Sequence, residues 1–243
     1  MFSASAELYD LIYSQFKDYA SETAEIAATI RQLHPSARTV LDVACGTGEH
    51  ARLLREAHGF EVDGLDLDPT FVTIARRKLP PEAVHQGDMI SFALPRRYDV
   101  VVCLFSSIGY VRTLENVRRT LARFREHLAG GGIMLIEPWF VPGALQPGRA
   151  FIKTAESESV SVARMSHLEI EDRISRLRFE YLIGRPAGIE HAVEIHELGL
   201  FTTDEMHECF RHAALETTHD PKGPSGRGLF FARPDPRCEE GAA

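Results

Sequence analysis

Runs of apolar residues alternate with amphipathic segments through the first 137 residues of the chain. Short apolar runs bounded by turn residues predict buried strands at 39–44, 60–67, 83–89, 98–105 and 132–137. Between them, apolar residues at helical spacing predict helices at 21–33, 48–59 and 69–79. A fourth helix is predicted from the apolar face Val117, Leu121, Phe124 and Leu128, closed by Gly130–Gly132. This alternation predicts an α/β fold with a parallel, doubly wound, Rossmann-like sheet.

Two of the predicted helices begin with recognisable capping residues. Ser21 is expected to cap the first helix, and Glu22 and Glu25 in its first turn suit the positive end of the helix dipole. Asp68 and Pro69 are predicted to be the N-cap and the first residue of the third helix. These signals indicate where each helix starts relative to the segment before it.

The pattern changes after Pro142. Residues 159–171, 173–184 and 192–201 alternate with a period of two, which predicts an antiparallel β insertion. A helix at 202–213 and two strands within 215–234 complete a main sheet of seven mostly parallel strands. The predicted domains are a cofactor-binding core with an N-terminal cap (1–137), the insertion (138–201), the final helix and hairpin of the core (202–237) and a frayed tail (238–243).

Composition narrows the possible partners. The 243 residues are 44% hydrophobic, enough for the core of one large domain, and their formal net charge of -8 disfavours binding to nucleic acid. No secretory leader and no run of about 18 apolar residues is found, so we expect no membrane contact and a cytoplasmic location. Four cysteines without a C-x-x-C pair predict reduced thiols. No metal is predicted, because His191 and His196 would face opposite sides of a strand.

The stretch "VLDVACGTGEH", residues 40–50, follows the first predicted strand and contains Gly46 and Gly48. In an open α/β sheet, ligands bind at the carboxyl ends of the strands, and glycines there let the backbone approach a ligand closely. The stretch Gly46-x-Gly48-x-x-Ala51 also satisfies the relaxed dinucleotide pattern. The loop alone therefore leaves open an NAD enzyme, another adenosine cofactor, or a turn without a ligand.

Acidic residues near this loop favour an adenosine cofactor that carries an ammonium group. Asp42 ends the first strand, where a carboxylate suits an ammonium and opposes a pyrophosphate. Glu49 opens the next helix, where a dinucleotide would place its phosphates. Asp66 ends the second strand, twenty positions after the first loop glycine, as needed to bind ribose hydroxyls. After the third strand, Asp88 can accept from an adenine amino group while the N–H of Met89 meets a ring nitrogen.

In order and spacing, the motifs "LDVACGTG", "GLDLD" and "QGDM" resemble those of class I S-adenosylmethionine-dependent methyltransferases, with Ala44 in place of the usual glycine. A closer resemblance extends from about Glu7 to Pro234. The segments "YDLIY", "KDYASE", "HQGDM", "FSSIGYV", "EPWF" and "GPSGRGLF" are similar to those of the N,N-dimethyltransferases that finish amino sugars such as desosamine and mycaminose on a thymidine diphosphate carrier. This resemblance implies S-adenosylmethionine as cofactor, a TDP-linked amino sugar as substrate, and a homodimer whose extra antiparallel sheet helps to form the subunit contact.

The resemblance also implies roles for particular residues. Those implied to surround the methionine part of the cofactor are Asp42, Ala44, Gly46 and Gly48. Those implied to hold its ribose and adenine are Asp66, Leu67, Asp88 and Met89. Tyr13 and Tyr19 lie in the N-terminal segment that covers the cofactor in this family. The alternative role for each is an aromatic side chain that only packs. The residues implied to line the substrate side are Ser106, Tyr110, Glu137, Trp139 and Arg227.

Methyl transfer to an amine requires few catalytic side chains. The nitrogen lone pair attacks the methyl group in line with the bond to the sulfonium sulfur, and no new charge is created. Alignment of two bound reactants supplies up to about 7 to 11 kcal/mol in favourable cases. Tyr110 is a candidate proton acceptor or orienter, although a phenol with an ordinary pKa near ~10 is a feeble base. Glu137 is an alternative partner for the ammonium or a sugar hydroxyl. We therefore expect positioning to dominate over obligatory base catalysis.

Arg227, within "GPSGRG", combines a guanidinium with exposed glycine N–H groups. It suits a diphosphate or the sugar that the diphosphate carries, unless it is a solvated turn arginine. Three other functions stay open at this point: methyl transfer to the nitrogen or oxygen of another small natural product, an NAD-dependent oxidoreductase, and a non-catalytic dimeric binding protein. Preference for S-adenosylhomocysteine over NADH separates the methyltransferase from the oxidoreductase, and a methyl-transfer assay separates an enzyme from a binding protein.

Overall fold

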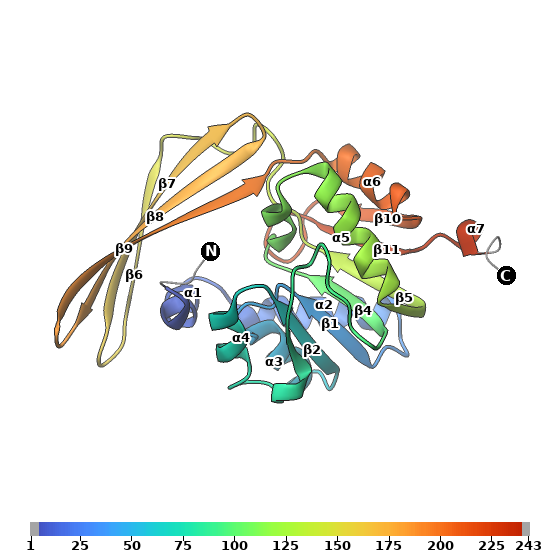
Figure 1. Cartoon of the computed structure of the whole chain (residues 1–243), viewed down its shortest axis with the longest axis horizontal. Coiled ribbons are helices and arrows are strands. Elements are labelled where there is room, and N and C mark those ends of the chain that lie inside the picture. Colours follow the sequence, from blue (N-terminus) through green and yellow to red (C-terminus); the bar gives the residue numbers. More distant parts are fainter. Residues whose placement is uncertain (1–4, 240–243) are drawn as a thin grey trace.

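A computed structural model describes residues 5–239 of the chain and contains two separate β-sheets (Figure 1). The larger sheet has seven strands in the order β10-β11-β5-β4-β1-β2-β3, and the smaller has four in the order β6-β7-β8-β9. The short helix α1 (Tyr9–Tyr13) lies between the smaller sheet and α4 (Figure 1). The predicted α/β fold, with a seven-stranded sheet and an antiparallel insertion, is confirmed.

The seven-stranded sheet is parallel except for β11, which runs antiparallel to both β5 and β10. The parallel pairs are β1–β2, β1–β4, β2–β3 and β4–β5. The chain order therefore reverses beside β1, which is where open α/β sheets bind ligands. The strands are β1 (Thr39–Val43), β2 (Glu61–Asp66), β3 (Val84–Gln86), β4 (Tyr98–Cys103), β5 (Leu128–Ile136), β10 (Leu215–Asp220) and β11 (Leu229–Pro234).

Helices cover both faces of this sheet (Figure 1). One face packs against α2, α3 and α4 through side chains such as Ile26, Leu54 and Val72. The other packs against α5 and α6 through side chains such as Leu121 and Phe210. Each such fully buried side chain contributes about 1.5–3 kcal/mol. The helices are α2 (Tyr19–Leu33), α3 (Glu49–Glu56), α4 (Pro69–Ala75), α5 (Leu114–Glu126), α6 (Thr203–His212) and α7 (Pro236–Glu239), with 3-10 turns η1 (Ala6–Leu8), η2 (Pro81–Ala83) and η3 (Ser107–Val111).

One of the two predicted helix caps is wrong. Helix α2 begins at Tyr19, because the side chain of Asp18 accepts a hydrogen bond from the backbone N–H of Ser21 and is the N-cap. Asp caps a helix as well as Ser does, and the acid stands earlier in the chain. The other prediction is confirmed: Asp68 caps α4 and Pro69 is its first residue.

The predicted end of the fourth helix is also wrong. Helix α5 ends at Glu126, and both Leu128 and Gly130–Gly132 belong to β5. The register between β4 and β5 shifts over this stretch, so the extra residues form an irregularity within the strand pair. Gly131 has a φ of +78°, which glycine adopts without strain. The glycines therefore bend a strand instead of closing a helix.

The antiparallel insertion contains four strands, whereas alternation predicted three. The strand that was missed, β6, lies at the edge of the sheet and exposes both Phe151 and Ile152, so it has no inward–outward alternation to detect. The inner face of the sheet packs against Leu8, Ile12 and Tyr13. The strands are β6 (Ala150–Glu156), β7 (Ser161–Glu171), β8 (Ile174–Arg185) and β9 (Gly188–Gly199).

Of the predicted tail at 238–243, residues 240–243 lie outside the described residues, and positions 238 and 239 end helix α7. The predicted frayed segment therefore begins inside a short helix. No helix within residues 5–239 is long and apolar enough to span a bilayer. The division of the chain into a core, an insertion and a returning segment stays a prediction.

Candidate active site

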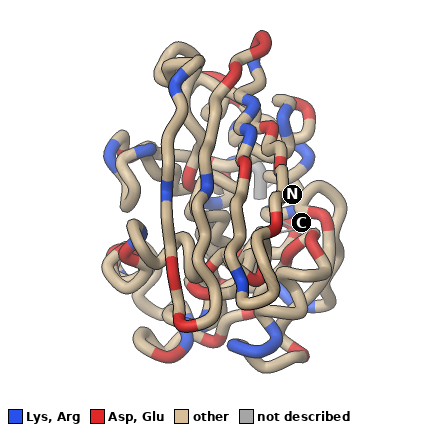
Figure 2. Tube along the Cα trace, turned by 90° about the vertical axis from the view of Figure 1, so that its left-hand side faces the viewer, with Lys and Arg blue, Asp and Glu red and all other residues tan. Residues whose placement is uncertain are grey.

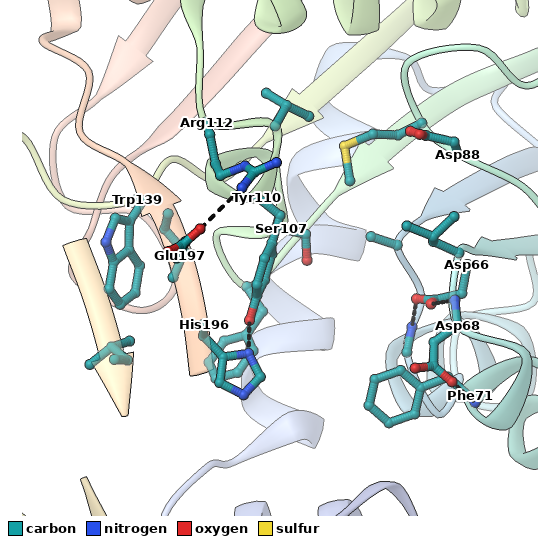
Figure 3. A pocket seen from close by; sticks show the side chains of 18 of the residues that line it. Asp66, Asp68, Phe71, Asp88, Ser107, Tyr110, Arg112, Trp139, His196 and Glu197 are labelled. Carbon is teal, nitrogen blue, oxygen red and sulfur yellow. Dashed lines mark hydrogen bonds and ion pairs between the residues drawn. The ribbon is translucent and has the colours of Figure 1, made fainter. Parts of the chain in front are cut away.

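A cavity of about 760 Å³ lies between the carboxyl ends of the central strands and the four-stranded sheet (Figure 3). The predicted site residues that line it are Tyr13, Ala44, Gly46, Asp66, Leu67, Asp88, Met89, Tyr110, Trp139 and Arg227. The predicted site residues that do not line it are Tyr19, Asp42, Gly48, Ser106 and Glu137. One side of the cavity in Figure 3, here called the β2 end, carries Asp66, Asp68, Phe71 and Asp88. The opposite side, here called the β9 end, carries Tyr110, Trp139, His196 and Glu197.

The loop after β1 is left-handed at alternate residues. Ala44, Gly46 and Gly48 have φ values of +57°, +58° and +78°. A Cβ at Gly46 would meet no atom within 4 Å, whereas one at Gly48 would lie 3.1 Å from the Cβ of Ala75. Gly46 therefore lets a ligand approach the backbone, and Gly48 lets the loop pack closely on α4. Ala44 adopts this conformation at a cost of roughly 1–2 kcal/mol, because it carries a Cβ.

Asp66, the last residue of β2, is fixed by two backbone hydrogen bonds. Its Oδ2 accepts from the N–H of Gly46 (2.8 Å), and its Oδ1 accepts from the N–H of Asp68 (2.9 Å). Burial raises the pKa of the Asp66 carboxyl, and these backbone bonds oppose the rise. Each carboxylate oxygen keeps a lone pair for a further donor, so the side chain is oriented to accept from a diol such as ribose.

Asp42, near the end of β1, is a buried carboxylate with an unsatisfied oxygen. It is 2% exposed, and its Oδ2 has no hydrogen-bond partner within the described part of the chain. Burial, and then the negative charge of Asp66, raises the pKa of Asp42 to about 8. A buried acceptor without a donor costs free energy that a ligand's donor can offset. Asp42 therefore has an oxygen left for a cation, and its predicted contact with the ammonium group of the cofactor stays a prediction.

The outer part of the β2 end suits a flat apolar ring with a polar edge. Leu67 is 47% exposed, and Phe71 on α4 lines the same part of the cavity. The Oδ1 of Asp88 accepts from the backbone N–H of Ile90 (2.9 Å), which fixes the carboxylate and leaves its second oxygen for a ligand. Met89 completes this wall. Apolar side chains beside an oriented acceptor are the arrangement that an adenine requires.

Helix α1 contributes aromatic side chains to the cavity. Tyr9 and Tyr13 stack with ring centroids 4.2 Å apart, and Tyr13 meets Phe105 edge-on at 5.5 Å. Tyr9 also lines the cavity, which the sequence analysis did not predict. Tyr19, at the start of α2, instead meets the ring of His50 edge-on at 4.9 Å. Of the two predicted tyrosines, Tyr13 therefore reaches the cavity and Tyr19 packs behind it.

Two aromatic residues at the β9 end are held by hydrogen bonds. The hydroxyl of Tyr110 lies 3.0 Å from Nδ1 of His196, and Nε1 of Trp139 donates to Oγ of Ser175 (2.8 Å). Burial raises the pKa of the Tyr110 phenol above its ordinary value. The phenol therefore keeps its proton at neutral pH, which favours an orienting role over a base.

Ser106 does not present its hydroxyl to the cavity. The side chain is buried, and its Oγ donates to the carbonyl of Pro138 (2.6 Å). The residue has a φ of +64°, so the chain turns sharply here at the start of η3. The next residue, Ser107, lines the cavity instead. A contact of Ser106 with substrate stays a prediction.

Arg227 is part of a buried ion pair. Its side chain is 14% exposed, and its Nη2 lies 2.7 Å from Oε1 of Glu137. Glu137 also accepts from the backbone N–H of Phe105 (2.6 Å) and from the hydroxyl of Ser225. The alternative of a solvated turn arginine is therefore wrong. Because Glu137 is enclosed by these donors, its predicted contact with an ammonium or a sugar hydroxyl stays a prediction.

A charged cluster at the β9 end was not predicted from the sequence. Nη1 of Arg112 lies 3.0 Å from one carboxylate oxygen of Glu197, and Nη2 of Arg176 lies 3.3 Å from the other. All three residues line the cavity and are partly exposed, and Figure 3 shows the ion pair between Arg112 and Glu197. Two guanidinium groups share one carboxylate, so the cluster has a net positive charge. Arg176 and Glu197 are paired across β8 and β9, and this register brings their side chains together. The alternation of apolar and polar residues predicts the strands but not which residues are paired.

Histidines and acids do not gather as they would at a metal centre. Within residues 5–239, no group of three or more His, Cys, Asp or Glu side chains is arranged to hold a metal ion. His191 is exposed and His196 is buried, so the prediction that they face opposite sides of a strand is confirmed. That the protein needs no metal stays a prediction.

Comparisons with known proteins match this geometry. Residues 40–132 match the family model of a methyltransferase domain. The chain is 41% identical over 236 residues to dTDP-3-amino-3,6-dideoxy-alpha-D-glucopyranose N,N-dimethyltransferase from Streptomyces fradiae, covering 96% of this chain and 92% of that protein. The crystal structure of DesVI from Streptomyces venezuelae has a TM-score of 0.88 and 38% identity, covering 94% of this chain and 98% of that one.

A structure with bound S-adenosylmethionine is also similar. CalS10, an amino pentose methyltransferase from Micromonospora echinaspora involved in calicheamicin biosynthesis, has a TM-score of 0.82 and 34% identity, covering 93% of this chain and 95% of that one. The sheet, the left-handed loop after β1 and the acids at the ends of β1 and β2 thus define a class I S-adenosylmethionine-dependent methyltransferase. Within that class, the chain belongs to the family of the dTDP-amino-sugar N,N-dimethyltransferases. The predicted enzyme class and cofactor are confirmed, and the oxidoreductase and non-catalytic alternatives are set aside.

Proposed function

We propose that this enzyme transfers methyl groups from S-adenosylmethionine to the amino group of a dTDP-linked amino-deoxy sugar, giving an N,N-dimethylated sugar for antibiotic biosynthesis. The observation that supports the proposal is one continuous cavity. Its β2 end suits a nucleoside, and its β9 end is cationic and aromatic. Relatives 41% and 38% identical are named for 3-amino sugars, and one 36% identical is named for a 4-amino sugar. We place the reaction in the cytoplasm, because Cys45, Cys103 and Cys209 are free thiols.

The β2 end is proposed to hold the cofactor. Asp66, oriented by the loop backbone, accepts from the ribose hydroxyls, and the unsatisfied Oδ2 of Asp42 accepts from the ammonium of the methionine part. Asp88 accepts from the adenine amino group, and Leu67 lies against the ring. When bound, S-adenosylmethionine supplies the methyl group on a sulfonium. The aromatic pair Tyr9 and Tyr13 covers this part of the cavity and excludes water from it.

The β9 end is proposed to hold the nucleotide-linked sugar. The net positive cluster of Arg112, Arg176 and Glu197 suits a diphosphate, because a guanidinium binds phosphate oxygens through paired N–H donors. The charge of Arg227 is balanced by Glu137, so this arginine suits the sugar better than the diphosphate. The cluster is partly exposed, which leaves room for the carrier to extend out of the cavity.

Positioning is proposed to supply most of the rate. The amine must lie in line with the transferred methyl group, and two reactants held in one cavity gain up to about 7–11 kcal/mol over the bimolecular reaction. The half-buried Tyr110 phenol, whose pKa is raised, orients the amine by a hydrogen bond and is no obligatory base. Trp139, fixed by Ser175, forms an apolar wall beside it.

The enzyme is proposed to be a homodimer that pairs through the four-stranded sheet. The outer face of that sheet, here called the outer patch, exposes six large apolar side chains: Ile152, Met165, Leu182, Ile189, Val193 and Ile195. Figure 2 views the sheet from this side, with long uncharged stretches between the charged positions of its strands. Monomers rarely leave such a surface in water, and a two-fold axis would bury two patches against each other.

A panel assay tests the proposed function. The enzyme is incubated with S-adenosylmethionine and dTDP-linked 3-amino or 4-amino deoxysugars, or with the matching free amino sugars, and release of S-adenosylhomocysteine is followed. We expect turnover of at least one dTDP-linked sugar and a much lower kcat/KM for its free counterpart, because the carrier contributes binding energy. Turnover of free sugars or unrelated amines alone would contradict the proposal and favour another natural-product substrate.

A further inference from the structure

The hydroxyl of Tyr110 links the cavity to a buried histidine. Tyr110 belongs to η3 and lines the cavity, and its hydroxyl lies 3.0 Å from Nδ1 of His196 on β9 (Figure 3). His196 is 1% exposed, and its ring also packs against Phe179 at 4.9 Å between centroids. The imidazole is therefore fixed in place on the side of the phenol that faces the antiparallel sheet.

The second nitrogen of His196 faces an anchored carboxylate. Nε2 lies 3.6 Å from Oε2 of Glu194, which is 4% exposed. Glu194 also accepts from the backbone N–H of Ser5 (3.0 Å), from its hydroxyl (2.9 Å) and from the hydroxyl of Tyr181 (3.0 Å). Burial raises the pKa of Glu194, but the neighbouring imidazole and these donors together keep it below its ordinary value. Tyr110, His196 and Glu194 thus form a row whose first two members line the cavity.

The charges around His196 determine which nitrogen carries the proton. Burial lowers the pKa of His196, so the ring is neutral at neutral pH and has one donor and one acceptor. Among the described residues, the titratable and charged groups around it are Glu194 on β9, Tyr110 on η3 and the Arg164 cation on β7, while Tyr181 on β8 donates to Glu194. Glu194 is the anion among them and can only accept, so the proton of the ring lies on Nε2 and Nδ1 is left as the acceptor.

We infer that His196 is a positioning residue for methyl transfer that acts through Tyr110. Nδ1 accepts the hydrogen bond of the phenol, which points the Tyr110 O–H at His196 and leaves the oxygen lone pairs for the substrate. The phenol then accepts from an N–H of the substrate amine, and the amine lone pair is free to point at the methyl group. No bond is made or broken by this row. The inference rests on the proposed function, because it concerns the amine of that substrate.

A protonated His196 would reverse this arrangement. With a proton on Nδ1, the ring donates to the phenol oxygen, and the O–H turns into the cavity, where it competes for the amine lone pair. Activity should therefore fall as His196 becomes charged, at a pH below the ordinary histidine value, because burial lowers its pKa. A residue that accepts a hydrogen bond from the phenol but does not titrate would not cause this loss of activity at low pH.

Substitutions at His196 separate orientation from packing. His196→Leu removes the acceptor and should lower kcat about 10-fold with little change in KM, while His196→Asn, whose amide oxygen can accept from the phenol, should stay within about 3-fold. Adding His196→Leu to Tyr110→Phe should lower kcat no further, because the phenol is the route of the effect. The ratio of wild-type to His196→Asn activity should fall with decreasing pH. The matched control is His212→Asn, which alters an exposed His–Glu pair on α6 with the same 3.6 Å separation.

Nuclear magnetic resonance decides the inference without turnover. In the protein bound to S-adenosylhomocysteine, imidazole ¹⁵N shifts, assigned by their absence in His196→Asn, should show a proton on Nε2 and an accepting Nδ1 whose shift moves in Tyr110→Phe. A proton on Nδ1 would overturn the inference, and this result does not depend on whether His196→Leu folds. Additive losses in the double variant would also overturn it. Absence of turnover on every dTDP-amino sugar would contradict the proposed function alone, since the tautomer is measured independently.

Discussion

Asp42 and Asp66 lie at neighbouring strand ends, and the negative charge of Asp66 adds to burial in raising the pKa of Asp42 to about 8. Their partners differ. Asp66 is held by two backbone N–H groups, whereas Asp42 has an oxygen without any hydrogen-bond partner in the described residues. One acid is thus oriented before a ligand arrives, and the other is destabilised until a cation arrives. This difference separates what each contributes to binding and to stability.

Asp42 should lower the stability of the ligand-free protein. A carboxyl whose pKa rises from 3.8 when unfolded to about 8 when folded stabilises the fold below its ordinary pKa, and that stability is lost as pH rises towards 8. We therefore expect Asp42→Asn to raise Tm by about 2 °C or more near pH 8 and to change it little near pH 4.

The same substitution should weaken binding of S-adenosylhomocysteine at least about 10-fold, which calorimetry measures. Asp63→Asn is the matched control. Asp63, on β2, is buried like Asp42, but its Oδ2 accepts from the hydroxyl of Tyr98 (2.6 Å). That variant should lose stability without losing ligand affinity. A Tm for Asp42→Asn that does not exceed the wild-type value near pH 8 would contradict the assignment.

Asp66 should be needed for cofactor affinity. Loss of its hydrogen bonds to the ribose hydroxyls, each worth about 1.5–3 kcal/mol for a charged acceptor, predicts at least about 10-fold weaker S-adenosylmethionine binding for Asp66→Ala. Asp99→Ala serves as control, because Asp99 accepts from the backbone of Arg38 and Thr39, at the start of β1. Equal affinities of the Asp66 variant and the wild type in calorimetry would remove the ribose assignment.

Arg176 should contribute to binding of the nucleotide carrier. If its guanidinium contacts the diphosphate, Arg176→Ala should raise KM for a dTDP-amino sugar about 10-fold with kcat little changed, since the carrier is bound alike in the ground and transition states. Arg233→Ala removes an exposed arginine from another cross-strand pair, with Glu216 at 3.2 Å, and should leave KM unaltered. Matching steady-state constants for Arg176→Ala and wild type would place the diphosphate elsewhere.

The outer patch should mediate dimerisation. We expect light scattering at micromolar concentration to give the mass of a dimer, and Leu182→Glu to give a monomer, because a charge placed in a buried apolar contact is strongly unfavourable. Leu33→Glu changes an equally exposed leucine at the end of α2 and should leave the dimer intact. A wild-type monomer, or a Leu182→Glu dimer, would show that the sheet has another partner or none.

The parts of this site that depend on residues adjacent in the chain can be predicted from the sequence. The glycine turn at Gly46 and Gly48 and the acid at position 66 were predicted, because a glycine turn after a buried strand constrains both backbone and ligand. The wrong cap at Ser21 arose between two equally good capping residues three positions apart. Such errors move a boundary without moving the site.

Residues that meet only through the register of the antiparallel sheet were not predictable. Arg176 and Glu197 are 21 positions apart and face each other across β8 and β9, and Arg112 reaches the same carboxylate from η3. His196 was correctly placed on the opposite side from His191, but its contact with Tyr110 depends on how two sheets pack. Ser106 shows the same limit at short range, because a positive φ turns its side chain from the cavity and presents Ser107.

The central claim is tested most directly by mass spectrometry of the product formed with S-adenosylmethionine that carries a trideuterated methyl group. With a dTDP-linked 3-amino or 4-amino deoxysugar, the account predicts labelled mono- and then dimethylated product, with fragmentation placing both labelled methyl groups on the sugar nitrogen. Label on a sugar oxygen, or no label on any nucleotide-linked amino sugar while S-adenosylhomocysteine still binds, would contradict it.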